Sequence, residues 1–344
     1  MRLVLAGVFA VMGLASQAVW GASFDCKLAK TAQEKAICAT PALSKADEDM
    51  AAAYKAVTAA VPVEMKPEVL AEQRGWVKGV AKTCKAGDAS LAACLQGVYL
   101  ARIKDLKGRV VTKNGVTFVM HAITLMAKDA EDESSPDIRE GEENPGFGTM
   151  HAQWPEALSS EPEWKTWNTA AMQEAQKLAR TDEKQPLGEW KTEWAAGMES
   201  QVTATMVSVG QGRVSVRLEE DIMGHGAAHP SESWESFHWL LKEQRALAVE
   251  DVFAAGSGWA AVVNARCMAG LVKQFGKDGL INDNPAGTVA EVTASVKNWG
   301  LTATGLVISF PEYTVSPRAA PADDVTVPWS VLKPYLATGF VMPQ

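Results

Sequence analysis

Three histidines and an aspartate lie close together in the chain at spacings that could bind zinc. His225 and His229 are four residues apart, with Asp221 and His238 on either side. Imidazole nitrogens and carboxylate oxygens are common zinc ligands. The segment is rich in glycine and precedes a predicted strand, however, whereas a His-x3-His pair normally binds zinc from one face of a helix. We therefore expect structural histidines, with His229 hydrogen-bonded to backbone beside Pro230, and no bound metal.

Other residues that could carry out catalysis are not arranged for it. The sequence contains no Gly-x-Ser-x-Gly, His-Glu-x-x-His, phosphate-loop or dinucleotide-binding motif. The acidic run Glu219-Glu220-Asp221 is more typical of a solvated strand edge than of an acid/base pair. Cys267 lies on an apolar helix face without an identifiable histidine, which predicts a buried free thiol rather than a nucleophile. We expect no cofactor and no enzymatic activity, and a metal-dependent hydrolase is the third hypothesis.

Four further cysteines near the N-terminus form a spaced set, Cys26, Cys38, Cys84 and Cys94. An even number of cysteines in an exported chain indicates disulfides, although four cysteines allow three pairings. We predict Cys26–Cys38 and Cys84–Cys94, because each pair flanks one turn between short elements and such a loop closes within disulfide reach.

Residues 1–22 have the pattern of a secretory signal peptide. Arg2 supplies a positive charge, an apolar run of 12 residues follows from Leu3 to Leu14, and small residues near Ala18 and Gly21 offer cleavage sites. An uncleaved anchor helix is the less favoured alternative. No later apolar run reaches the roughly 20 residues of a membrane helix. We expect a periplasmic or secreted product whose mature chain has no membrane span.

The charge is unevenly distributed between two predicted domains, 23–110 and 111–344. The first carries 14 Lys and Arg against 10 Asp and Glu, and the second carries 18 against 31, a net charge of −13. Such a negative field disfavours nucleic acid and favours basic partners. Much of it lies in residues 129–143, which Pro136, Gly141 and Pro145 mark as a solvated loop.

Residues 23–110 have the pattern of a small helical domain. Thr31 and Glu34 form a predicted capping box, Ser44 and Asp47 repeat it, and Pro67 opens a later helix. Mostly apolar residues, with the polar Gln73 among them, then recur at helical spacing on three faces: Leu43, Met50, Tyr54, Val57 and Val61; Leu70, Gln73, Trp76, Val77 and Val80; Leu91, Leu95, Tyr99, Ile103 and Leu106. These stripes are short, so we expect the disulfides to supply much of the stability.

The same residues resemble the LprI-type lysozyme inhibitor domain, a family of small exported proteins. The resemblance covers most of residues 24–108 and rests on the four cysteines, Gln73-x-x-Trp76 and Tyr99-x-x-Arg102. It implies binding to a peptidoglycan hydrolase rather than catalysis.

Residues 111–344 mix strands and helices without regular alternation. Period-two segments predict strands at 116–126, 201–210, 213–222, 233–241 and 305–310, and helical spacing predicts helices at 161–179 and 258–275. The predicted fold class is therefore a small all-α, disulfide-stapled domain followed by an α+β domain with a mixed or antiparallel sheet. Trp164 and Trp167 lie on one helix face, which favours core positions over stacking on glycan rings.

This half is similar to the C-terminal extracellular domain of RsiV-type anti-sigma factors. The resemblance spans roughly residues 200–337 and rests on Ala228-His229-Pro230 and on segments 235–240, 247–253, 310–315 and 327–336. It implies a lysozyme-binding or cell-wall-associated module.

Together these features predict an exported binding protein that engages lysozyme or a related peptidoglycan hydrolase and inhibits it by occlusion. A cell-wall glycan-binding accessory module, with peptidoglycan as the partner, is the alternative. Candidate partner-binding residues are acids and loop residues of the second domain together with an aromatic pair in the first, namely Glu219, Asp221, Gly224, His225, His229, Pro230, Glu232, Trp76 and Tyr99.

Overall fold

The computed structural model describes residues 22–85, 87, 90–129, 146–180, 186–276, 279–281 and 283–343. The predicted signal peptide and most of the predicted acidic loop lie outside these ranges. The chain divides into two compact units that meet between Gly108 and Arg109. Each unit is described by itself.

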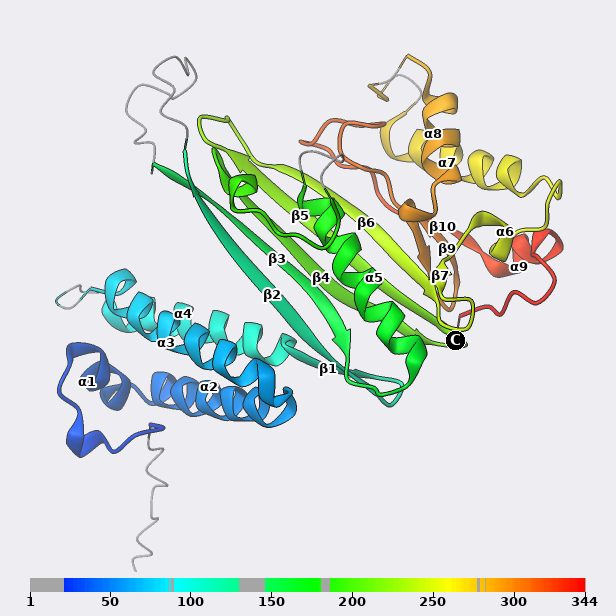
Figure 1. The fold of residues 1–344 in the computed structure, drawn as a ribbon. Helices are drawn as coiled ribbons and strands as arrows, with labels where there is room; N and C mark the ends of the chain where they lie inside the picture. The colour runs from blue at the N-terminus through cyan, green and yellow to red at the C-terminus, as the bar shows by residue number, and fades with distance from the viewer. Residues whose placement is uncertain are drawn as a thin grey trace, which may run out of the picture. The chain divides into compact units, whose positions relative to one another are not determined.

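The first unit consists of helices (Figure 1). Its helices are α1 (Ala32–Ala39), α2 (Pro41–Ala60), α3 (Lys66–Thr83) and α4 (Leu91–Gly108), with short 3₁₀ turns at Cys26–Leu28 and Val63–Met65. The Thr31 side chain accepts from the Glu34 amide while Glu34 accepts from the Thr31 amide, so the predicted capping box is present at the start of α1. Pro67 lies in the first turn of α3, where its missing N–H costs nothing.

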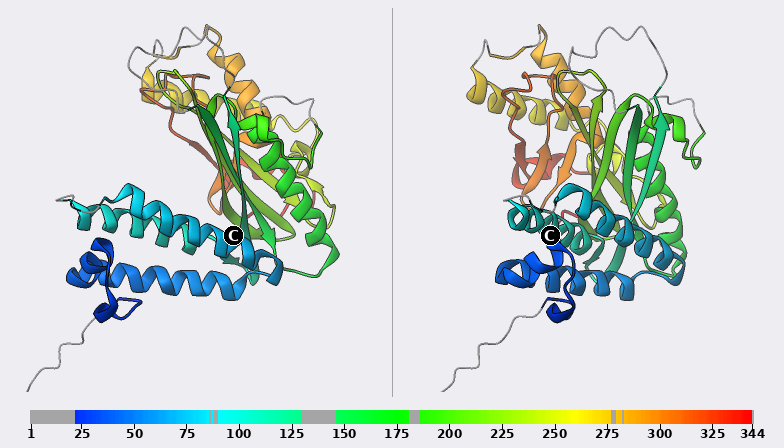
Figure 2. Two further views of the ribbon diagram at one scale, coloured as in Figure 1. Left: turned by 60° about the vertical axis from the view of Figure 1, so that its left-hand side comes forward. Right: turned by 90° about the vertical axis from the view of Figure 1, so that its left-hand side faces the viewer.

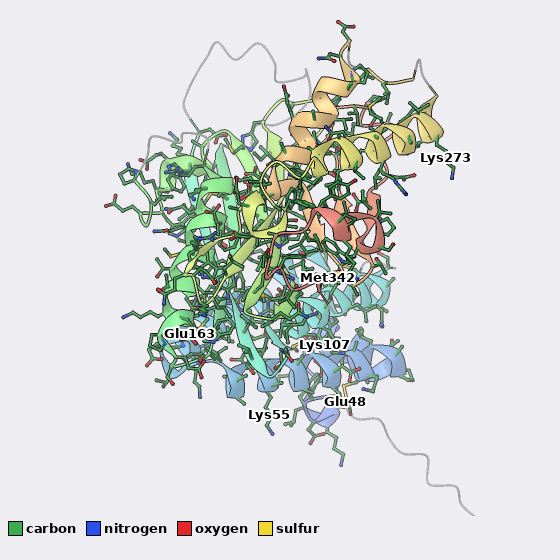
Figure 3. The ribbon with its side chains drawn as sticks, turned by 90° about the vertical axis from the view of Figure 1, so that its right-hand side faces the viewer. Glu48, Lys55, Lys107, Glu163, Lys273 and Met342 are labelled. Carbon is green, nitrogen blue, oxygen red and sulfur yellow. A yellow bond between two sulfur atoms is a disulfide. The ribbon has the colours of Figure 1, made fainter. Side chains whose placement is uncertain are left out.

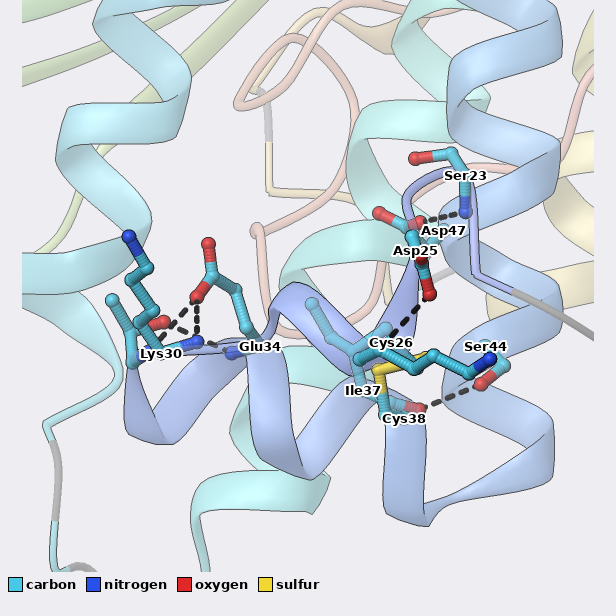
Figure 4. The surroundings of a disulfide bond; sticks show 11 residues. Ser23, Asp25, Cys26, Lys30, Glu34, Ile37, Cys38, Ser44 and Asp47 are labelled. Atoms are coloured by element: carbon cyan, nitrogen blue, oxygen red, sulfur yellow. Dashed lines mark hydrogen bonds between the residues drawn. A yellow bond between two sulfur atoms is a disulfide. The ribbon is translucent and has the colours of Figure 1, made fainter.

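Two disulfides close the ends of this helical unit. They join Cys26 to Cys38 and Cys84 to Cys94, the two pairs predicted from the spacing. Figure 4 shows the first disulfide beside the start of α2. Each bond closes a local loop, which restricts the unfolded chain and so stabilises the folded one.

The second predicted capping box is wrong. Pro41 and Thr40 start α2 one turn earlier, so Ser44 and Asp47 lie within the helix and are buried. The Ser44 hydroxyl donates to the Ile37 carbonyl at 2.7 Å, and Asp47 accepts from the Ser23 amide at 2.6 Å (Figure 4). Both side chains therefore connect neighbouring segments instead of capping their own helix.

The core of the helical unit lies between α2 and α4, with Leu43, Val57 and Leu95 almost fully buried. The predicted face of α3 is wrong in part, because Val69 is buried whereas Leu70 and Val77 are 40% and 55% exposed. The shift arises because Gln73 and Trp76 pair with residues of α4 and so turn Val69 inward.

The second unit is built on a seven-stranded mixed sheet, in agreement with the predicted fold class. Its strands follow the chain order: β1 (Val110–Lys113), β2 (Val116–Lys128), β3 (Phe147–Ala157), β4 (Met198–Gly210), β5 (Arg213–Gly224), β6 (Ser231–Leu240) and β7 (Arg245–Ala246). All neighbours pair antiparallel except β3 and β4, which are parallel. Parallel strands need a crossover, and α5 (Pro162–Ala179) lies between them in the chain.

Helix α5 covers one face of this sheet (Figure 2). Its apolar stripe buries Trp164 and Trp167 against Phe118 of β2 and Phe237 of β6, with ring centroids 5.7 to 6.5 Å apart. These two tryptophans are core residues, as their helical spacing predicts.

The C-terminal third adds a second core on the other side of the sheet. It contains α6 (Val249–Val252), α7 (Trp259–Phe275), α8 (Pro285–Ala294), β8 (Trp299–Leu301), β9 (Gly305–Ile308), β10 (Val325–Pro328) and α9 (Trp329–Leu332). The strands form a three-stranded antiparallel sheet in the order β10-β9-β8. His238 of β6 ties the two sheets together through a 2.9 Å hydrogen bond to the Trp299 carbonyl. Charged side chains such as Lys273 of α7 point outward (Figure 3).

Cys267 of α7 lies within this second core as a buried free thiol, as predicted. Burial raises the pKa of its thiol to about 12, because the core cannot solvate a thiolate. No helix in the described ranges has the length and apolarity needed to cross a bilayer.

Candidate functional site

A cavity of about 450 Å³ opens between strands β5 and β6 and the segment 310–324. Charged residues dominate its lining, with six carboxyl groups against two guanidinium groups. The charged residues are Glu219, Glu220, Asp221, Glu232, Glu312 and Asp324, together with Arg217 and Arg318. The cavity therefore attracts cations.

Strand register brings the acids of β5 and β6 together. Asp221 lies directly opposite Glu232, and Glu219 lies opposite Trp234. Because side chains two residues apart on a strand share a face, Glu219 and Asp221 project to the same side. Like charges directly opposite one another destabilise a sheet, so Asp221 and Glu232 remain together only if other charges offset them.

Two arginines supply positive charge close to these acids. Arg318 donates to Glu232 at 2.5 Å and approaches Glu312 at 3.5 Å, which joins the segment 310–324 to β6. Arg217 donates to Glu219 at 2.7 Å while its guanidinium lies 4.3 Å from the ring centroid of Trp234. The guanidinium groups of Arg217 and Arg318 are therefore both paired with carboxylates of the protein itself.

Among the described residues, three carboxyl groups of the cavity are left without such a partner, namely the buried Glu220 and the exposed Asp221 and Asp324. Asp221 and Asp324 form no ion pair within the part of the chain that the structure describes. They are the groups in the cavity that an external cation would meet first.

Glu220 is the most buried acid of the cavity, with 7% of its surface exposed. Burial, together with the charges of Asp221 and Glu235, raises the pKa of its carboxyl to about 7, although hydrogen bonds from Ser233 and Ser200 oppose the change. The Ser233 hydroxyl lies 3.1 Å from the Glu220 carboxylate. Near neutral pH this group therefore exchanges a proton, and a bound cation would favour its ionised form.

The predicted partner-binding residues fall into three places. Glu219, Asp221 and Glu232 line the cavity. Of the predicted loop residues, Gly224 ends β5 and His225, His229 and Pro230 lie in the β5–β6 connection; none of them is part of its lining.

The β5–β6 connection is held by its own contacts. The His225 Nδ1 atom lies 2.7 Å from Asp129 Oδ2, and Asp129 also accepts from the Gly197 amide at 2.9 Å. The exposed His229 ring lies 3.0 Å from the Pro230 carbonyl, which also accepts from Arg318. Arg318 thus anchors both the loop and the cavity.

The predicted aromatic pair lies in the first unit. Trp76 and Tyr99 pack edge to face with ring centroids 5.1 Å apart, and Tyr99 is only 7% exposed. Burial and the neighbouring Asp47 raise the pKa of the Tyr99 hydroxyl. Nearby, Arg102 donates to Gln73 at 3.0 Å, so the Gln-x-x-Trp and Tyr-x-x-Arg motifs pair with one another between α3 and α4.

The candidate zinc ligands are not gathered in one place. His238 is buried between Ser215 and the Trp299 carbonyl, whereas His225 contacts Asp129. Within the described ranges, no three His, Cys, Asp or Glu side chains are placed to hold a metal ion together. Burial lowers the pKa of His238 to about 4, so this ring is neutral and structural at pH 7.

Trp154 of β3, outside the helical stripe, is stacked on other rings. Trp154 lies parallel to both His121 and Trp190, with ring centroids 5.5 Å apart in each case. The Trp154 ring therefore stacks on other rings of the protein, which leaves it unsuited to stacking on a sugar ring.

The sequence alone did not identify Glu220, Trp234, Glu312, Arg318 and Asp324 as members of the site. Glu312 lies in segment 310–315, which contributes to the RsiV-like resemblance but contains no pattern that indicates a binding site. Arg318 and Asp324 lie in a loop about 90 residues from β6, and no local pattern connects a loop to a strand at that distance. The acidic run Glu219-Glu220-Asp221 in β5 is the signal that the sequence offers.

Comparison with known families assigns two parts of the chain. Residues 26–106 match the family described as lysozyme inhibitor LprI, and residues 250–330 match a family described as a protein of unknown function, DUF3298. The chain therefore carries an LprI domain near its N-terminus and a DUF3298 domain near its C-terminus, and the RsiV-like resemblance is consistent with this assignment. No curated protein gives a significant match.

Two crystal structures of DUF3298 family proteins are similar to the chain. One is from Pseudomonas aeruginosa PAO1, with 14% identity, a TM-score of 0.45, and coverage of 65% of this chain and 97% of that chain. The other is from Bacteroides fragilis NCTC 9343, with 14% identity, a TM-score of 0.43, and coverage of 66% and 96%.

Proposed function

We propose that this protein is exported, with residues 1–22 removed, and that it binds lysozyme or a related peptidoglycan hydrolase in the periplasm or outside the cell. Inhibition would follow from occlusion of the cleft of the hydrolase. The observation that carries the proposal is the match of residues 26–106 to the lysozyme inhibitor LprI family, which supports lysozyme inhibition in general. We retain 23–110 and 111–344 as the proposed domain limits.

The acidic cavity of the second unit supplies a chemical basis for holding a basic partner. Lysozymes are commonly basic proteins, and a lysine or arginine side chain would fit a cavity of about 450 Å³ lined by unpaired Asp221 and Asp324. Charge complementarity of this kind mainly increases the association rate and decays with salt, because the Debye length is about 8 Å at physiological ionic strength.

The first unit offers a different kind of surface. Leu70 and Val77 lie two turns apart on α3 and are both exposed, so they form an apolar stripe on the helical domain. Because Trp76 packs against Tyr99, we take this stripe, rather than the aromatic pair, as a candidate apolar contact surface of the LprI domain. The two surfaces predict different responses to salt.

The test measures binding and inhibition of a basic lysozyme by mature protein and two sets of variants. The first set is Asp221→Asn with Asp324→Asn in the cavity, matched by Glu193→Gln with Glu243→Gln, which removes the same charge from exposed positions elsewhere on the unit. The second set is Leu70→Ser with Val77→Ser.

If the cavity directs binding, the first pair lowers the association rate at least tenfold at low salt, the matched pair changes it little, and raising the salt reduces the wild-type rate. If the apolar stripe carries binding, only Leu70→Ser with Val77→Ser weakens it, and salt has little effect. Absence of any lysozyme binding, together with retention on insoluble peptidoglycan, would replace the inhibitor by the wall-binding alternative.

A further inference from the structure

Arg213, the first residue of β5, is a buried cation without an anionic partner. The residue is 6% exposed, and its Nε atom is buried without a hydrogen-bond acceptor. Its guanidinium lies 5.6 Å from the ring centroid of Phe340, and no ion pair to Arg213 exists in the described part of the chain. Burial lowers the pKa of this guanidinium.

The other arginines with described side-chain contacts show how unusual this is. Arg102, Arg217, Arg245 and Arg318 each contact a carboxylate, namely that of Asp105, Glu219, Asp251 and Glu232 respectively. A buried charge without a partner costs several kcal/mol, so buried charges in proteins are normally paired. The surroundings of Arg213 therefore leave room for a negatively charged partner that the described part of the chain does not supply.

The Arg213 side chain lines a cavity of about 490 Å³ at one end of the sheet. The lining comes from the β1–β2 turn, the β4–β5 turn and the C-terminal segment, and consists of Asn114, Ser208, Val209, Gly210, Gln211, Arg213 and Pro343. Arg213 is the one charged residue among these seven. The volume lies in the range of about 300–1,000 Å³ that is typical of small-molecule sites.

The two turns direct polar groups into the same space as the guanidinium. Asn114 and Gln211 both adopt positive φ angles, 47° and 55°, as tight hairpin turns require. A Cβ atom on Gly210 would lie 3.7 Å from the Asn114 side-chain amide, so this amide lies against the β4–β5 turn. The β4–β5 pairing also shifts register between Met206 and Ser208, a local irregularity of the kind that redirects side chains near functional sites.

We propose that this cavity binds the carboxylate of a small organic acid, with Arg213 as its counter-ion. The planar guanidinium matches a carboxylate with two parallel hydrogen bonds, and the Asn114 and Ser208 side chains add polar groups. One guanidinium balances one negative charge, which favours a monocarboxylate over a phosphate dianion. Val209 and Pro343 provide apolar surface for the remainder of the acid.

The site is separate from the acidic cavity. Arg213 and Asp221 are eight residues apart on β5, a distance of about 27 Å along a strand at the usual rise of about 3.4 Å per residue. Occupation of the carboxylate site therefore does not depend on the proposed function.

The experiment uses mature protein and the probes acetate, butyrate and hexanoate, with inorganic phosphate and chloride at the same ionic strength. Melting temperature and titration calorimetry report binding by wild type, Arg213→Gln and, as a control at an exposed position of α7, Arg266→Gln. We expect the three carboxylates to bind wild type and the Arg266 control with affinity that rises with chain length, and to lose at least tenfold in affinity for Arg213→Gln. In chloride, Arg213→Gln should melt at or above the wild-type temperature, because an unpaired buried charge is gone.

Three results would overturn the proposal. Equal shifts in wild type and Arg213→Gln would show a general salt effect, and tighter binding of phosphate than of hexanoate would refute the carboxylate assignment. A variant with two glycines added after Gln344 tests whether the carboxylate that ends the protein used in the experiment, rather than a free acid, pairs with Arg213. If only this extended chain binds the probes, the terminus is the partner of Arg213 and the cavity is no site for a free acid.

Discussion

The buried carboxyl of Glu220 predicts a specific dependence of stability on pH. Its pKa is about 7 in the folded protein against an ordinary value of 4.5. Below pH 4.5 the group is protonated in both the folded and the unfolded chain. Between pH 4.5 and 7 the folded protein keeps a proton that the unfolded chain has lost, so stability falls as the pH rises across this interval and levels off above pH 7.

Replacing Glu220 by Gln removes this loss. The difference between about 7 and 4.5 corresponds to about 3 kcal/mol of unfolding free energy, at about 1.4 kcal/mol for each pKa unit. Glutamine keeps an acceptor for the Ser233 hydroxyl, 3.1 Å away, and has nearly the same volume. We therefore expect the variant to gain about 3 kcal/mol relative to wild type between pH 4 and pH 8.5.

Urea unfolding between pH 4 and pH 9 measures this gain. Ten of the twelve tryptophans lie in residues 109–344, so tryptophan fluorescence reports mainly on the unit that contains Glu220. Glu219→Gln removes a carboxyl group from an exposed position in the same cavity and serves as the control. Parallel pH profiles for wild type and Glu220→Gln would show that burial does not hold the proton on Glu220 and would refute the reasoning.

Three further predictions concern the disulfides, the core and the histidines. Replacing Cys84 and Cys94 by Ser should destabilise the helical unit by about 2–3 kcal/mol, because the bond closes a loop of 10 residues, and circular dichroism with and without reductant would measure it. Trp167→Ala should cost about 3–5 kcal/mol in urea unfolding of the second unit, since the ring is fully buried under α5; a loss below 1 kcal/mol would contradict its place in the core. Elemental analysis after dialysis should find no stoichiometric zinc, and chelator should leave the melting temperature of wild type and of His225→Ala unchanged; about one metal ion per chain would restore the hydrolase hypothesis.

The sequence by itself determined the local structure of this protein. The cysteine spacing predicts the two disulfide pairs, because a loop of 10 or 12 residues closes without help from distant segments. The Thr31–Glu34 capping box and the alternation in β4 and β5 are likewise decided by contacts between residues near one another in the chain. Where two helix starts competed, at Pro41 and at Ser44, the fixed φ of proline in the first turn prevailed.

Only the tertiary structure decided which charged groups meet. The contact of Arg318 with Glu232 joins residues 86 apart, and it determines that Glu232 is neutralised while Asp221 is not. The sequence likewise shows that Arg213 starts a strand but not that its guanidinium is buried away from every described carboxylate. Side-chain pairing between distant segments depends on strand register and on how the second core packs against the first sheet, and these follow from the whole fold rather than from any local pattern.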